Sequence, residues 1–382
     1  MSKVHSEQVV FFFGAGASAP FGIPTMKQFV VDFEKYLHGN ANDSEIKLYR
    51  DIKETLEQRS SDQVDLEAVF TVIDGIINYS QERLGLLSLY LATKFREPNK
   101  LDKSLCKSLR GKFRKFVKEK CEIPEESRDK IKMVYKDFFN RFALELSGSN
   151  INQRNEYAWQ RDWSIFTTNY DTCLEYYWNV ATEIGVDTGF EHVKRKNVNV
   201  LRPLKFLQEG IGIQLFKLHG SINWFIEKGT DKVIEVTTKG DSYVGREYSG
   251  EMMVYPIAEK ELYTDPYISM LLRLNRELEK KSTWIIIGYS FNDPIIREIF
   301  LRNSSSTKHL ILVHPRAKDV FNRKLDSIRA KKSLMEKWFG LRKKEEVLHG
   351  EDKKENYKKM NHQIIHKLRE NPRFQWHDNV VP

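Results

Sequence analysis

The sequence has few cysteines and no long apolar run. Only three cysteines occur among 382 residues, and no two of them form a CxxC pair that could grip zinc. Cys106, Cys121 and Cys173 are too few and too scattered for a disulfide framework, so we expect reduced, buried thiols. No run of about 18 or more apolar residues is present to span a membrane, and the N-terminus lacks the features of a signal peptide. A cytoplasmic protein without a membrane partner is expected.

The sequence also lacks the signatures of a dedicated DNA reader, although it is basic. No RNP motif, zinc finger or obvious helix-turn-helix accompanies the formal net charge of +9. The charge is concentrated in two stretches: residues 315–382 carry 18 Lys or Arg against 10 Asp or Glu, and residues 94–120 carry 11 against 3. Such basic faces can meet nucleic acid, an acidic partner or only water, and these alternatives stay open.

Apolar residues are plentiful enough for a sizeable core, and their pattern changes along the chain. They make up 40% of a sequence that is long enough for one large or two ordinary domains. From residue 27 to about 159 they recur at three- and four-residue spacings, as in "LEAVFTVIDGIINY", which predicts helices. From residue 163 short apolar runs alternate with helical segments, and after His314 the chain becomes charged and helical. These patterns predict an α/β protein with a helical insertion and a helical C-terminal segment.

The stretch "VVFFFGAGASAPFGIPTM" at residues 9–26 joins an apolar run to a glycine-containing turn. A buried parallel strand has such a continuous apolar run, and a glycine turn after it can present backbone N–H groups to a phosphate at the start of a helix. The turn lacks the third glycine of the full dinucleotide fingerprint, and no GK[ST] follows it. A tight strand-to-helix turn without a ligand is therefore the alternative.

Four expected strands end in unusual polar residues. The four strands are followed by "GAGAS", "TNYD", "HGS" and "GYSFND". Because the carboxyl ends of parallel strands lie at one edge of a sheet, these motifs are expected to meet there. Each motif has a purely structural alternative: Asn169 and Asp171 could cap a helix, His219 could be an ordinary loop histidine, and Asp293 before Pro294 could only start the next helix. The presence of all four motifs at one edge favours a ligand site there.

The order of these motifs resembles that of the sirtuin family. Sirtuins carry a GAGxS turn followed by GIPDFR, then TQNID, HG and a GTS-type turn, and this chain has "GAGASAPFGIPTM", "TTNYD", "LHGSIN" and "GYSF" in the same order. The resemblance implies a doubly wound, Rossmann-like sheet with a core at 1–26 and 160–316, and the helical insertion at 27–159 resembles the variable insertion of the family's bacterial members. The basic helical C-terminal segment at 317–382 lies outside the resemblance. The resemblance also implies NAD binding by Gly14, Ala15, Gly16, Ala17, Ser18, Pro24, Thr25, Asp171, Gly288, Ser290, Phe291 and His314.

Departures from the sirtuin pattern narrow the expected activity. Deacetylating sirtuins have zinc-binding cysteines after the HG motif, whereas residues 223–267 contain none, so no metal is expected. The DFR that follows GIP is replaced by residues 25–27, and the Gln of TQNID by Thr168. "KLHGSINW" and "GYSFNDP" instead resemble the sirtuin-like NADases of bacterial antiviral defence. This resemblance implies an NAD glycohydrolase that depletes the cell of NAD in abortive infection.

The resemblance makes His219 and Asn169 the catalytic pair. An imidazole can take a proton from water or from a ribose hydroxyl, and an amide can orient that water without carrying charge. An NAD-dependent protein deacylase and a non-catalytic sensor of NAD or ADP-ribose are the alternative functions. Similar defence operons encode a HerA-type ATPase, which implies gating by a ring-forming partner, homo-oligomers, and contact with nucleic acid only through that partner.

Overall fold

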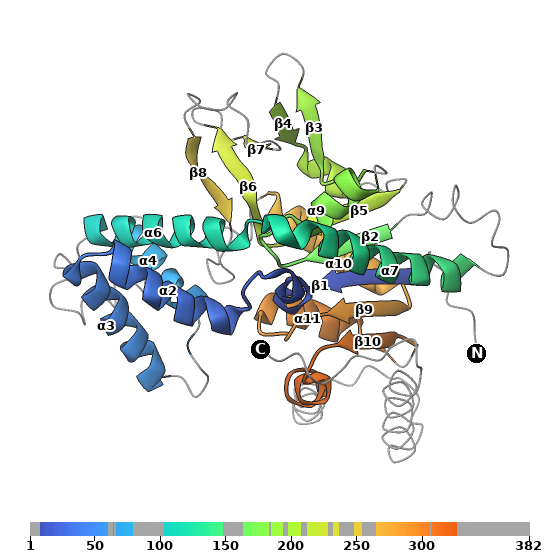
Figure 1. Ribbon diagram of the computed structural model, residues 1–382. Coiled ribbons are helices and arrows are strands. Elements are labelled where there is room, and N and C mark those ends of the chain that lie inside the picture. The colour runs from blue at the N-terminus through green and yellow to red at the C-terminus, as the bar shows by residue number, and fades with distance from the viewer. Residues whose placement is uncertain are drawn as a thin grey trace.

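The computed structural model describes two β-sheets surrounded by helices (Figure 1). The residues that it describes are 8–59, 64, 66–78, 103–147, 163–182, 185–193, 198–207, 212–227, 232–236, 248–253, 265–305 and 307–326. Residues 327–382 of the expected C-terminal segment lie outside these ranges, as do residues 79–102 and 148–159 of the expected insertion.

One sheet consists of five parallel strands, in the order β10-β9-β1-β2-β5. These strands are β1 (Val9–Phe13), β2 (Trp163–Thr167), β5 (Ile213–Lys217), β9 (Thr283–Ile287) and β10 (His309–Val313). Successive strands are added outward from β1, first on one side and then on the other, which is the doubly wound arrangement. The predicted fold class, an α/β protein with a doubly wound parallel sheet, is therefore confirmed.

The apolar run of β1 is continuous because both faces of the sheet are covered. Val9, Phe11 and Phe13 belong to one buried cluster, and Val10 and Phe12 belong to the other. Side chains alternate between the two faces of a strand, so a strand in a central layer has no polar face. Helix α7 (Arg128–Ser147) packs on the first face, where aromatic rings of the helix contact Phe11 and Phe13. Helices α10 (Tyr267–Lys280) and α11 (Pro294–Asn303) cover the second face.

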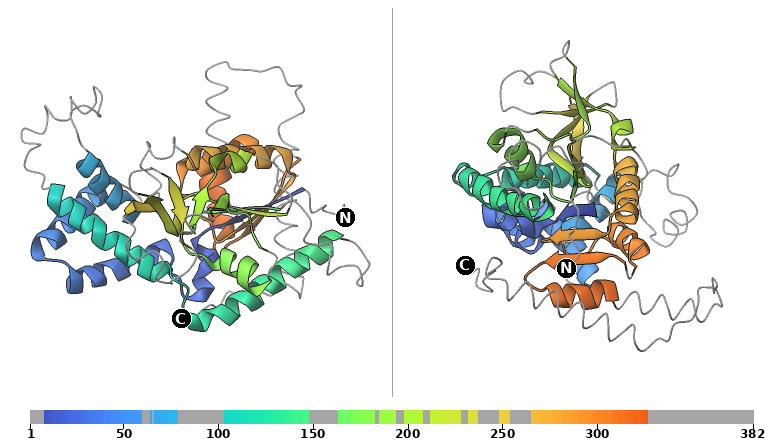
Figure 2. Two further views of the ribbon diagram at one scale, coloured as in Figure 1. Left: turned by 90° about the horizontal axis from the view of Figure 1, so that it is seen from above. Right: turned by 90° about the vertical axis from the view of Figure 1, so that its right-hand side faces the viewer.

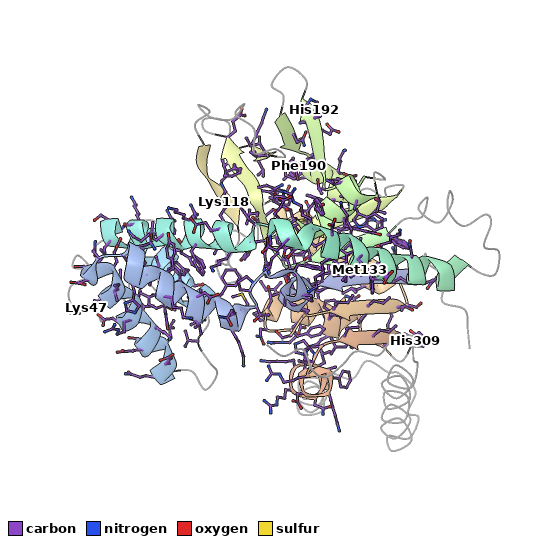
Figure 3. The ribbon with its side chains drawn as sticks, in the orientation of Figure 1. Lys47, Lys118, Met133, Phe190, His192 and His309 are labelled. Carbon is purple, nitrogen blue, oxygen red and sulfur yellow. The ribbon has the colours of Figure 1, made fainter. Side chains whose placement is uncertain are left out.

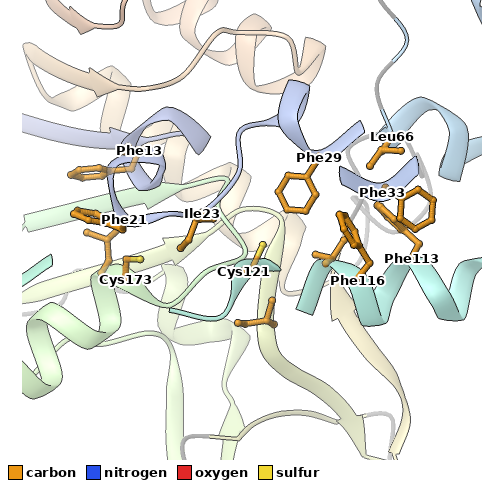
Figure 4. Packing of buried hydrophobic residues seen from close by; sticks show 14 of the residues in the cluster. Phe13, Phe21, Ile23, Phe29, Phe33, Leu66, Phe113, Phe116, Cys121 and Cys173 are labelled. Carbon is orange, nitrogen blue, oxygen red and sulfur yellow. The ribbon is translucent and has the colours of Figure 1, made fainter. Parts of the chain in front are cut away.

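The helical block shares a core with the sheet. It contains α2 (Met26–Asn40), α3 (Asp43–Arg59), α4 (Leu66–Asn78) and α6 (Lys103–Cys121). Phe33 of α2 packs against Phe70, Phe113 and Phe116, and the rings of Phe70 and Phe113 stack with their centroids 3.7 Å apart. Figure 4 shows these rings continuing along buried side chains to Phe13 at the end of β1. The segment is thus anchored on the same face of the sheet as α7.

A second sheet consists of five antiparallel strands, two of which precede His219 in the chain. Its order is β3-β4-β7-β6-β8, and it stands above the parallel sheet in Figure 1. The strands are β3 (Phe190–Val193), β4 (Val198–Leu201), β6 (Gly220–Glu227), β7 (Val233–Glu235) and β8 (Tyr248–Met253). The amino-acid sequence does not predict this sheet, because several of its strands are only three to six residues long and carry weak apolar patterns.

Short helical segments connect these elements, and Figure 2 shows the arrangement from two further sides. They are α1 (Ala15–Ser18), η2 (Ala19–Phe21), η4 (Glu125–Ser127), α9 (Cys173–Tyr176), η6 (Tyr177–Ala181), η7 (Pro203–Leu207), α12 (Ala317–Val320) and η10 (Phe321–Asp326). The three cysteines form no disulfide bond and are buried, as predicted. Among the described residues, no helix is long and apolar enough to cross a membrane.

Candidate functional site

The loops that follow β1 and β9 meet at the point where the strand order reverses. The backbone N–H of Gly14 donates to the carbonyl of Ile287 at 2.8 Å, and that of Gly16 donates to the carbonyl of Gly288 at 2.9 Å. Gly288 has a φ of 65°, and a Cβ there would lie 2.2 Å from the nitrogen of Ala17. The glycines of both loops therefore allow the two backbones to approach closely. This close packing would account for the glycines even if the turn bound no ligand.

Asn169 joins the loop after β2 to the glycine turn. Its Nδ2 donates to the carbonyl of Gly14 at 3.1 Å and to the hydroxyl of Ser18 at 2.9 Å. Its Oδ1 is buried and accepts no hydrogen bond from the described residues. A buried amide oxygen without a donor is costly, so this atom is suited to accept a hydrogen bond from a ligand or a water molecule. Asn169 and the "GAGAS" turn therefore lie side by side, as expected from their positions at the ends of neighbouring strands.

A buried lysine holds the "TNYD" loop in place. Lys217, at the end of β5, is fully buried, and its ammonium donates to the carbonyls of Tyr170 and Asp171 and to Glu175 Oε1 at 2.7 Å. Burial raises the pKa of Glu175, although the charge and hydrogen bond of Lys217 oppose that shift. Asp171 itself accepts from the backbone N–H of Cys173 at 3.0 Å, although the N-cap residue of α9 is Thr172. Lys217 was not among the predicted site residues; the signal that could have found it is a charged residue inside the apolar run "QLFKLHG".

His219 contacts a carboxylate that comes from the far side of the site. Its Nε2 lies 3.0 Å from Oδ2 of Asp293, and both side chains are buried. Asp293 is also the N-cap of α11: its Oδ1 accepts from the backbone N–H groups of Ile295 at 2.8 Å and of Ile296 at 3.0 Å. The expectation that Asp293 starts this helix is confirmed, but the contact with His219 was not foreseen.

The electrostatics of this pair favour an ionised carboxylate. Burial raises the pKa of Asp293, but the hydrogen bond and charge of His219 and the two backbone amides lower it by more, so the net shift is downward. A carboxylate accepts hydrogen bonds and donates none, so the imidazole nitrogen that faces Asp293 carries the proton.

The remaining residues expected to bind NAD are dispersed around this edge of the sheet. Ala15, Gly16, Gly288 and Ser290 are half-buried beside the loop contact, while Ala17 and Ser18 are buried. Pro24 and Thr25 are half-buried in the connection that leads to α2.

Phe291 and His314 occupy positions that limit what they can contribute. Phe291 has a φ of 57°, and its ring is buried against Tyr289 and Phe300, so only its backbone could face a ligand. His314 follows β10 and is half-buried; burial and the nearby charge of Arg316 lower its pKa. The binding roles of the two residues stay predictions.

Another buried carboxylate, that of Glu235, lies in the antiparallel sheet, and the charge of Glu175 affects its pKa. Glu235 of β7 accepts from Asn199 Nδ2 at 3.2 Å and from Asn223 Nδ2 at 3.5 Å. Burial, together with the negative charge of Glu175, raises the pKa of Glu235 to about 7. No group of three or more metal-ligating side chains occurs in the part of the chain that the structure describes.

Comparison with known families identifies one related family for part of the chain. Residues 164–339 match the family model described as SIR2-like domain, and the match spans the chain from β2 to beyond β10. Three of the four loops of the site, those after β2, β5 and β9, lie within it. No curated protein matches this chain. The match supports a sirtuin-like family and the use of NAD.

Proposed function

With a SIR2-like domain as the premise, we propose that this protein hydrolyses NAD at the bond between nicotinamide and ribose. The observation that carries the proposal is the position of His219 and Asn169, which follow the neighbouring strands β5 and β2 at the edge of the sheet where the glycine turn lies. Open α/β sheets bind their ligands at this edge, beside the strand where the order reverses.

The chemistry of the proposed step suits these groups. Cleavage passes through an oxocarbenium-like state: the C–N bond breaks with its electron pair on nicotinamide, and a water oxygen bonds to the ribose carbon. His219 takes the proton that the water releases, and Oδ1 of Asn169 accepts a hydrogen bond from the water or from a ribose hydroxyl. The products are nicotinamide, ADP-ribose and one proton.

The wider role rests on the resemblance of the motifs. We propose that the activity serves abortive antiviral defence, where destruction of NAD stops the infected cell, and that a ring-forming ATPase of the HerA type gates it. The basic surface of α6 is a candidate contact for that partner or for self-assembly. Lys118, labelled on α6 in Figure 3, is exposed. Its ammonium lies 5.7 Å from the ring centre of Phe225. A monodisperse monomer in light scattering, together with failure to co-purify an ATPase, would remove this part of the proposal.

The activity is tested by incubating the purified protein with NAD and following nicotinamide and ADP-ribose. Hydrolysis without a peptide supports the proposal, release of nicotinamide only with an acylated peptide indicates a deacylase, and binding without turnover indicates a sensor. His219→Ala and Asn169→Ala should each reduce turnover about a hundredfold or more while NAD still binds. The double variant should lose far less than the product of the two effects, because residues that act as a unit are not additive.

His309→Ala is the matched control. This histidine is exposed at the start of β10, and Figure 3 shows it at the periphery of the molecule. Turnover should be unchanged in this variant. Normal NAD hydrolysis by His219→Ala would refute the catalytic assignment, and a large loss of melting temperature in that variant would make His219 a structural residue.

A further inference from the structure

We infer that Asp293 is a positioning residue that holds His219 in the tautomer with the proton on Nε2, so that Nδ1 is the base. The inference rests on the proposed function, because it says which nitrogen of His219 receives the proton. It assigns Asp293 a second role besides capping α11.

The geometry of the carboxylate leaves one oxygen for each role. Oδ1 of Asp293 is occupied by the backbone N–H groups of Ile295 and Ile296, at 2.8 and 3.0 Å. Oδ2 is 3.0 Å from Nε2 of His219, and the two side chains are only 5% and 6% exposed. Because the helix cap fixes the orientation of the carboxylate, Oδ2 has a fixed direction in which to accept the proton on Nε2.

The other imidazole nitrogen is available for the reaction. No described residue makes a hydrogen bond to Nδ1 of His219 that would compete with a substrate or water. With the proton held on Nε2, the lone pair of the neutral ring resides on Nδ1. When Nδ1 takes a proton from water, Asp293 faces the resulting imidazolium and stabilises its charge.

Asp293→Asn separates the two roles of this residue. The amide oxygen of Asn can still accept from Ile295 and Ile296, since Asn is as good a helix N-cap as Asp. Its NH₂ group, however, donates to Nε2 of His219 and so moves the ring proton to Nδ1, where it blocks the base. Asp293→Ser is the matched control: it also caps the helix, but its short side chain does not reach His219, so the tautomer is left free.

The tautomer is measured directly by long-range ¹⁵N–¹H correlation spectra of the full chain at alkaline pH, with His219→Ala used to assign the signal. We expect His219 to carry its proton on Nε2 in the native protein, on Nδ1 in Asp293→Asn, and on a mixture of both in Asp293→Ser. This measurement does not depend on catalysis. It therefore tests the inference even if the native protein fails to hydrolyse NAD, an outcome that would refute only the proposed function.

Kinetics give the second readout. In Asp293→Asn, kcat for NAD hydrolysis should fall about a hundredfold or more with little change in KM, and the loss in Asp293→Ser should be smaller. Three results would overturn the inference: an Nδ1–H tautomer in the native protein, an unchanged tautomer in Asp293→Asn, or an equal loss of melting temperature and activity in both variants.

Discussion

Replacing Glu235 by Gln should stabilise the protein, and the gain should grow with pH. Glu235 is buried between Asn199 and Asn223, and Oδ1 of Asn223 is buried without a hydrogen-bond donor among the described residues. A glutamine at this position keeps an oxygen for Nδ2 of Asn199. Its NH₂ group can donate to Oδ1 of Asn223 once that amide rotates, so the variant removes a buried charge and satisfies a buried oxygen.

The magnitude follows from the shifted pKa of Glu235. Its pKa in the folded protein is about 7, and in the unfolded chain it is about 4.3. Between these values the unfolded state has lost the proton that the folded state keeps, so the free energy of unfolding falls as pH rises. At about 1.4 kcal/mol per pKa unit, the loss approaches about 4 kcal/mol once the pH is well above the folded value. Below the unfolded value Glu235 contributes no such loss.

Urea denaturation of both proteins at pH 5 and pH 8 tests this reasoning. The difference in the free energy of unfolding between Glu235→Gln and the native protein should increase by about 2.5 kcal/mol from the lower pH to the higher. Glu191→Gln is the control, because Glu191 lies on β3 of the same sheet but is exposed and paired with Arg202 at 3.0 Å, where a change costs little. A constant difference between Glu235→Gln and the native protein at the two pH values would refute the argument.

Two further predictions concern the packing of the site. Gly288→Ala should destabilise the protein strongly and abolish NAD binding, because the added Cβ meets the nitrogen of Ala17 and the φ of this residue is positive. Gly75→Ala is the control: an added Cβ there meets no atom, so alanine within α4 should raise the free energy of unfolding by about 0.5–1 kcal/mol. Both are read from melting curves and calorimetry, and normal NAD binding by Gly288→Ala would contradict the first. Lys217→Met should cost about 3–5 kcal/mol, since it leaves Glu175 buried without its partner, and adding Glu175→Leu should restore part of the loss. A double variant no more stable than Lys217→Met would contradict the ion-pair argument.

The parallel sheet and the location of the site could be predicted from local patterns. A central strand such as β1 is covered on both faces, so its sequence is a continuous apolar run that stands out from the surrounding helices. Because parallel strands end at one edge, the polar residues that follow them meet there without any knowledge of side-chain contacts. Asn169 and the glycine turn were brought together by this argument, and the structure has them in contact.

The antiparallel sheet and the buried charges could not be predicted in this way. β7 has only three residues, too few for a periodic pattern, so nothing in the sequence marks Glu235 as buried. Lys217 follows apolar residues in β5, but its partner Glu175 lies 42 positions away, in the short helix α9. A charge inside an apolar run indicates a buried partner, whereas the identity of that partner depends on how the loops pack.

Asp293 shows why a correct local prediction can hide a functional contact. An aspartate before a proline satisfies the rules for starting a helix, and the structure bears out that role through one carboxylate oxygen. Capping uses Oδ1 alone, and the sequence contains no sign of what Oδ2 meets, because His219 is 74 positions away. The same cap that accounts for the residue also orients its second oxygen toward the imidazole. Each acceptor atom of a polar residue at the edge of an α/β sheet can therefore have its own role, so a helix cap made by one oxygen does not exclude a functional contact of the other.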